Sequence, residues 1–188
     1  MYQSEMTSTT QVSFPFLCEL EEKWTDVLEE LDILLFNEAV SNISLFKSHP
    51  ETAVYSGNWD RFYFWEDGKK NKKNCELCPK TTELIKNIPK VVSAGLVLLS
   101  RESHIKPHSD PANGLSRCHL SLVSPDALKE YDRRATCALI AKTCGLRVED
   151  EIYYWTPGYA FVFSDFKEWE AWNWGDRTCF VLEIDFKA

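Results

Sequence analysis

His104-Ile-Lys-Pro-His-Ser-Asp-Pro-Ala-Asn113 lies between an apolar run, Ala94–Leu99, and a second strand-like segment, Arg117–Val123. It contains His108 and Asp110, whose side chains point the same way at the end of a strand, because the strand period is two residues. An imidazole nitrogen and a carboxylate oxygen are two of the three ligands in the facial triad that holds non-haem Fe(II). The segment therefore predicts part of a metal site, with a third ligand expected further along the chain.

A His-x-Asp pair alone is a weak signal, and it has a structural alternative. Asp110 can cap the turn that follows it while His108 packs against an aromatic side chain. The surroundings favour a metal site, because Arg117 and His119 also alternate and Arg177 opens another predicted strand. A planar guanidinium is suited to binding a carboxylate through two hydrogen bonds. Together these residues predict a pocket for Fe(II) and a dicarboxylate.

The second half of the chain has the pattern of a β-protein. Short runs rich in Val, Leu, Ile, Phe and Tyr are separated by turn signals such as Pro157-Gly158, which predicts a sandwich or barrel. A helical insert is expected at about 126–144, where Ser124-Pro125 can start a helix and Gly145 can end it. The expected strands are Ala94–Ser100, His119–Val123, Arg147–Tyr154, Tyr159–Phe163 and Thr178–Phe186.

The first half predicts helices that flank this sheet. Apolar residues recur at helical spacing over residues 16–36, which predicts an amphipathic helix with an acidic outer face. A turn and a short aromatic strand are expected over Tyr55–Trp65. A short helix is expected over Pro79–Pro89, with Thr81 or Thr82 as its cap.

Length and composition predict one folded domain. The chain has 188 residues, 44% of them hydrophobic, and residues 14–188 are expected to form a single domain after a flexible N-terminus, residues 1–13. Because the net charge is −8 and no basic stripe interleaves with aromatics, nucleic acid is not an expected partner. The cationic run Lys69–Lys73 is more simply explained as a solvated turn. A small molecule or a peptide is the expected partner.

The sequence also bears on the compartment. No apolar run reaches the roughly 20 residues that span a bilayer, and the N-terminus lacks the layout of a signal peptide. The seven cysteines, an odd number, are therefore expected to be free thiols of a cytoplasmic protein. Cys75-Glu-Leu-Cys78 has neither a second Cys pair nor a βαβ context, so zinc or thioredoxin-type chemistry is not favoured.

Short motifs are spread along nearly the whole chain: Tyr55-Ser-Gly-Asn-Trp59, Cys78-Pro-Lys-Thr81, Ile88-Pro89, Ser103–His108, Arg117-Cys-His-Leu120, Tyr154-Trp155, Phe163-Ser-Asp165, Trp172-Asn173 and Arg177–Asp185. Together they resemble the aspartyl/asparaginyl β-hydroxylase domain of the Fe(II)/2-oxoglutarate-dependent oxygenases. Each motif is short, but their order and spacing make the resemblance specific. It implies a double-stranded β-helix, or jelly roll, with dioxygenase activity.

The resemblance also implies roles for single residues. His108 would be the first metal ligand, and Arg177 would hold the distal carboxylate of 2-oxoglutarate. The cosubstrate pocket would be lined by Arg117, His119 and Trp59. Fe(II) and 2-oxoglutarate are the implied cofactors, and the implied chemistry couples decarboxylation of the oxo acid to oxidation of an unactivated C–H bond.

The chain departs from the family pattern at three places. Trp169 stands where the family has its second metal-binding His, and no His follows His119. An indole has only a donor N–H and cannot ligate a metal. Asp110 stands where many members have Gly, so His108 and Asp110 are the two protein ligands that the sequence still predicts. The insert at about 126–144 replaces a short loop.

Two functions therefore stay open at the level of sequence. The first is an Fe(II)/2-oxoglutarate-dependent hydroxylase with an atypical His-x-Asp site and an amino-acid-derived or small-metabolite substrate; the retained Arg117, His119 and Arg177 favour it. The second is a degenerate member without oxidative activity, which serves as a small-molecule- or protein-binding module or as a non-oxidative enzyme such as an isomerase. Trp169 favours the second function, because a bulky indole can fill a metal cavity.

Overall fold

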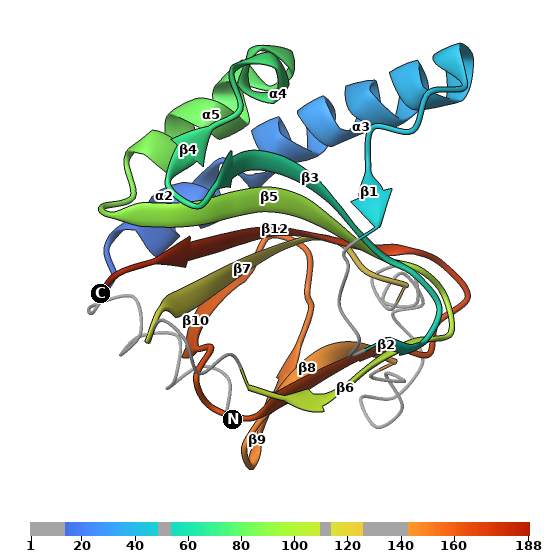
Figure 1. Cartoon of the computed structure of the whole chain (residues 1–188), viewed down its shortest axis with the longest axis vertical. Helices are drawn as coiled ribbons and strands as arrows, with labels where there is room; N and C mark the ends of the chain where they lie inside the picture. Colours follow the sequence, from blue (N-terminus) through green and yellow to red (C-terminus); the bar gives the residue numbers. More distant parts are fainter. Residues whose placement is uncertain (1–13, 49–53, 110–113, 126–142) are drawn as a thin grey trace, which may run out of the picture.

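The computed structural model describes residues 14–48, 54–109, 114–125 and 143–188, and it has two facing β-sheets with helices on one side (Figure 1). The helices are α2 (Phe16–Glu22), α3 (Trp24–Ser41), α4 (Lys72–Leu77) and α5 (Pro79–Lys86). The strands are β1 (Lys47–Ser48), β2 (Val54–Ser56), β3 (Trp59–Glu66), β4 (Lys69–Lys70), β5 (Val91–Leu99), β6 (Ser103–His108), β7 (Ser116–Val123), β8 (Cys144–Val148), β9 (Glu151–Tyr154), β10 (Ala160–Ser164), β11 (Trp169–Asn173) and β12 (Cys179–Phe186). In these ranges no helix is both long enough and apolar enough to cross a bilayer.

The two sheets form a jelly roll. The larger sheet has the order β1-β3-β5-β12-β7-β10, with β4 paired to β3, and the smaller has the order β2-β6-β11-β8-β9. The central pairs are antiparallel, such as β12 with β5 and β7, and β11 with β6 and β8. The main contacts between the helices and the strands are all with the larger sheet, whose outer face the helices cover (Figure 1). The predicted fold, mainly β with flanking helices, is confirmed.

Strand β12 separates two hydrophobic cores. Because side chains alternate along a strand, Phe180 and Leu182 face the helices while Cys179 and Val181 face the space between the sheets. We call the apolar cluster beneath the helices the outer core and the cluster between the two sheets the inner core. Both cores are closed by the same strand, which is buried along its whole length.

The start of α5 corrects one expectation about caps. Cys78 occupies the N-cap position and makes no side-chain cap, while Thr81 and Thr82 lie inside the helix. Backbone N–H groups of the first turn, which have no acceptor within the helix, donate hydrogen bonds to a side chain of α3 instead. The carboxylate of Glu30 accepts hydrogen bonds from the backbone N–H groups of Lys80 and Thr81, both at 2.8 Å, and from Thr81 Oγ1 at 2.7 Å.

Other boundaries also differ from the expected ones. The run expected over 147–154 is a hairpin of β8 and β9, with Glu149 in its turn at a φ of 51°. Gly145 lies inside β8 and does not end a helix; a Cβ there would lie 2.5 Å from the carbonyl oxygen of Tyr153. The predicted insert falls mainly on residues 126–142, outside the described ranges.

Candidate functional site

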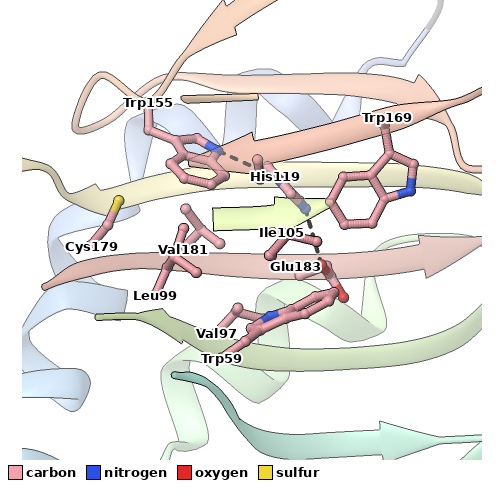
Figure 2. A pocket seen from close by; sticks show the side chains of 11 residues that line it. Trp59, Val97, Leu99, Ile105, His119, Trp155, Trp169, Cys179, Val181 and Glu183 are labelled. Carbon is pink, nitrogen blue, oxygen red and sulfur yellow. Dashed lines mark hydrogen bonds and ion pairs between the residues drawn. The ribbon is translucent and has the colours of Figure 1, made fainter. Parts of the chain in front are cut away.

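A small cavity lies between the two sheets, within the inner core (Figure 2). Its volume is ≈ 10 Å³, which is room for about one water molecule. Three tryptophans and several aliphatic side chains form most of its wall. The lining residues are Trp59, Val97, Leu99, Ile105, His119, Trp155, Trp169, Ala171, Cys179, Val181 and Glu183.

A hydrogen-bonded chain of three side chains crosses this wall (Figure 2). Trp155 Nε1 donates to His119 Nδ1 at 3.3 Å, and His119 Nε2 lies 3.1 Å from Glu183 Oε2. Because an indole nitrogen only donates, His119 Nδ1 is the acceptor, and the proton of the neutral imidazole is on Nε2. His119 therefore donates to Glu183.

Two arginines complete a buried polar cluster. Arg61 Nη2 lies 2.8 Å from Glu183 Oε1. Arg117 binds Asp185 through two hydrogen bonds, of 2.6 Å from Nε and 3.0 Å from Nη2, and its Nε lies 3.9 Å from Glu183 Oε2. Register explains the grouping, because Glu183 and Asp185 on β12 pair with His119 and Arg117 on β7. The charges of the two arginines balance those of Glu183 and Asp185, and the buried Asp165 adds a further negative charge that acts on Arg117.

Burial and neighbouring charges fix the protonation states in the cluster. Burial by itself raises the pKa of Glu183, but Arg117, Arg61 and the hydrogen bond from His119 outweigh it and hold that pKa far below its usual value. Burial also lowers the pKa of His119, and Glu183 offsets this only in part. The cluster therefore contains a carboxylate and a neutral imidazole near neutral pH.

Trp169 fills the end of the cavity next to His108. The two residues are register partners across β11 and β6, and their ring centroids lie 4.3 Å apart. Trp169 is 1% exposed, meets Trp59 edge to face at 5.9 Å, and lies 5.6 Å from the guanidinium carbon of Arg117. Its Nε1 has no hydrogen-bond partner in the described part of the chain. The indole is thus packed as a core residue against the predicted metal ligand.

His108 itself is oriented by a local hydrogen bond. Its Nδ1 lies 2.7 Å from the carbonyl oxygen of Lys106. Because a carbonyl only accepts, Nδ1 carries the proton and the lone pair of the neutral ring is on Nε2. Asp110, the second predicted ligand, lies outside the described residues.

The predicted cosubstrate residues do not all come together. Arg117, His119 and Trp59 lie on the inner face of the larger sheet, as the alternation argument expected for the first two. Arg177 lies between β11 and β12 with an exposed side chain, and the cavity is lined instead by Cys179, two residues further on. The role of Arg177 in holding a carboxylate stays a prediction.

Sequence reasoning missed two charged members of the cluster. Glu183 and Arg61 were not singled out, although each stands in a strongly apolar strand. The available signal was the spacing of Glu183 and Asp185, because two acids at alternate positions of a buried strand must face the same interior and need cationic partners.

The CxxC segment belongs to the outer core. Cys75 and Cys78 are both buried there, and Cys75 Sγ contacts the carbonyl oxygen of Phe64 at 3.5 Å. Burial, with a contribution from Glu30, raises the pKa of Cys78 to about 12, so its thiol stays protonated. These cysteines pack as small apolar residues.

The described residues do not by themselves form a site for the cofactors that the resemblance implies. Within the described ranges no three His, Cys, Asp or Glu side chains lie close enough together to hold a metal ion. A dianion such as 2-oxoglutarate would meet the Glu183 carboxylate in a cavity of ≈ 10 Å³, with Arg61 and Arg117 already paired.

Comparisons with known proteins give a family match over most of the chain. The family described as Aspartyl/Asparaginyl beta-hydroxylase matches residues 21–188. An ornithine lipid ester-linked acyl 2-hydroxylase from Rhizobium tropici is 29% identical over 175 residues, which are 93% of this chain and 58% of that protein. Human aspartyl/asparaginyl beta-hydroxylase is 26% identical over 172 residues, which are 88% of this chain and 20% of that protein.

The chain spans less than two thirds of either relative. Among solved structures, a predicted oxalate decarboxylase from Thermotoga maritima matches with a TM-score of 0.48 and 10% identity, over 79% of this chain and 96% of that one. A similarity this weak supports no conclusion about activity.

Proposed function

The chain belongs to the aspartyl/asparaginyl β-hydroxylase family, a family of hydroxylases, and we propose that it is a member without 2-oxoglutarate-dependent activity whose barrel interior binds a small uncharged molecule. One observation carries the proposal: Trp169 fills the interior beside His108, at the position where the family resemblance places the second metal-binding His. The fully buried indole therefore takes the space beside His108 in which the family's second ligand would stand.

The side chains that line the cavity favour an uncharged ligand. Aromatic and aliphatic side chains dominate the cavity, and its two polar members, His119 and Glu183, already bind each other. Pockets with mostly apolar walls and a few fixed polar groups suit small, largely apolar molecules. Because the cavity has room for about one water, a larger ligand requires a wall side chain to move.

Turnover of the cosubstrate tests this proposal directly. Purified protein with Fe(II), 2-oxoglutarate and O₂ is expected to release no succinate above a protein-free control. Mn(II) and 2-oxoglutarate are expected to leave the melting temperature unchanged. Succinate release that depends on the protein would overturn the proposal.

The variant Trp169→His provides a more specific test, because it places an imidazole on β11 directly opposite His108 on β6. Ni(II) or Mn(II) is expected to raise the melting temperature of this variant by several degrees through binding to the folded state alone. The matched control is the double variant His108→Ala/Trp169→His, which should lose the metal response. A metal response equal in the single and double variants would show that His108 does not take part.

A second candidate is the hydroxylase with a His108–Asp110 metal site and an amino-acid-derived or small-metabolite substrate. The hydrogen bond from His108 Nδ1 to Lys106 favours it, because metal-binding histidines commonly donate their other N–H to a carbonyl or carboxylate. This candidate is supported if the protein releases succinate and if both His108→Ala and Asp110→Ala abolish that release.

A further inference from the structure

Two arginines and a histidine from two strands surround the Glu183 carboxylate. Arg61 on β3 lies 2.8 Å from Oε1, and His119 on β7 lies 3.1 Å from Oε2. A second guanidinium, that of Arg117, lies 3.9 Å from Oε2. Guanidinium groups and an N–H around one carboxylate are the chemistry of an anion-binding site. Here the anion belongs to the protein.

We propose that Glu183 is a built-in occupant of a carboxylate-binding site, so that its own side chain takes the place of an anionic ligand. Glu183 and His119 both line the cavity, so a group that enters the cavity reaches the same donors. Asp185 binds Arg117 through two hydrogen bonds, which leaves Glu183 as the carboxylate that balances Arg61 among the described ion pairs.

This arrangement makes Glu183 a specificity-determining residue. A carboxylate that enters the cavity meets a like charge and donors that are already engaged, so the wild-type site rejects small carboxylates and 2-oxoglutarate. Truncation to Ala removes a carboxymethyl group, which has the size of acetate. The truncated site then has both the donors and the space for acetate or propionate.

Chemical rescue tests the proposal. Glu183→Ala and wild type are melted in sodium acetate or propionate, up to about 100 mM, and in sodium chloride at the same concentration. If acetate binds near 1 mM, the variant is expected to gain roughly 5 °C in acetate over chloride, by mass action. Wild type should show no such difference. The double variant Arg61→Met/Glu183→Ala, which lacks a direct donor, should lose the gain.

Two results overturn the proposal: no carboxylate-specific gain in Glu183→Ala, or an equal gain in wild type. If Glu183→Ala does not fold in chloride, refolding yields of Glu183→Ala and Glu183→Ser are compared in chloride and in acetate, and equal yields also overturn it. Turnover of 2-oxoglutarate by wild type would refute the proposed function, whereas the acetate response decides whether Glu183 occupies an anion site.

Discussion

Trp169 and Glu183 fill the barrel interior with the chain's own atoms. The indole packs against His108 at a tilted angle and meets Trp59 edge to face, while the carboxylate forms an ion pair with Arg61 and accepts a hydrogen bond from His119. Burial of an indole contributes several kcal/mol, and a paired buried carboxylate becomes costly if its partners are removed. The two side chains therefore stabilise a closed interior, because both form part of the cavity wall.

His119 predicts a pH dependence of stability. Its pKa is lowered in the folded state by burial from an ordinary value of 6.5, so the unfolded chain binds more protons as the pH falls below about 6.5. The free energy of unfolding is therefore expected to fall with decreasing pH in that window, by at most about 1.4 kcal/mol per pH unit from this group. Glu183 does not interfere, because its lowered pKa costs stability only as the pH falls below about 4.5.

The measurement is urea unfolding of wild type and His119→Gln between pH 7.5 and 5. Gln keeps a donor and an acceptor but does not titrate, so the difference between the two free energies of unfolding should shrink as the pH falls. Parallel curves over the whole range would contradict a buried neutral His119.

For single residues, the sequence predicted which way a side chain points better than it predicted which residues that side chain contacts. The alternation of Arg117 and His119 placed both side chains on the inner face, because the strand period depends only on local geometry. It did not place Arg61 beside Glu183, because that contact joins β3 to β12 across β5 and depends on the sheet order.

Helix α5 depends on a single carboxylate from another helix. Glu30 is 6% exposed and accepts three hydrogen bonds at the start of α5, where no local side chain caps the helix. A carboxylate at a helix N-terminus also interacts favourably with the helix dipole. Glu30 thus attaches α5 to α3 and compensates for the missing cap.

Glu30→Ala is therefore expected to destabilise the fold by about 2–4 kcal/mol, because it leaves buried donors on Lys80 and Thr81 without a partner. For a chain of this size that corresponds to a decrease of roughly 5–15 °C in melting temperature, measured by circular dichroism. The control is Glu29→Ala on the exposed face, which removes only a surface ion pair with Lys80 and should change stability by less than about 1 kcal/mol. Equal effects of the two substitutions would contradict the capping role.

Elements with strong local patterns were predicted well, and those defined by partners were not. Strand β12 follows from apolar periodicity. So does the helical region over residues 16–36, but the single helix expected there is two, α2 and α3, which meet at Lys23, and α3 continues to Ser41. The β8–β9 hairpin was expected as one strand, because its turn residue with a positive φ is Glu149 and not the Gly or Asn that usually indicates such a turn. Strand β11 was not among the expected strands, because its buried face includes Ala171 and Asn173, which are residue types with low strand propensity.

The whole molecule is organised around β12, which closes both cores. Its even-numbered residues, such as Leu182, belong to the outer core beneath the helices, and Val181 belongs to the inner core around the cavity. Because β12 contributes side chains to both cores, unfolding of this strand would disrupt both of them. The helical layer and the barrel interior should therefore unfold as one cooperative unit.

Two spectroscopic probes test this coupling in one thermal scan. Circular dichroism at 222 nm reports the helices over the outer core, and the near-ultraviolet signal includes Trp59, Trp155 and Trp169 of the inner core. Coincident midpoints are the criterion for a two-state transition.

Leu182→Ala should lower both midpoints together by roughly 5–15 °C, because deletion of a fully buried Leu costs about 2–5 kcal/mol. Val181→Ala, on the other face of the strand, should also lower both, by less, since it removes fewer buried carbons. If Leu182→Ala shifts only the far-ultraviolet midpoint, the helical layer unfolds separately and β12 does not couple the two cores.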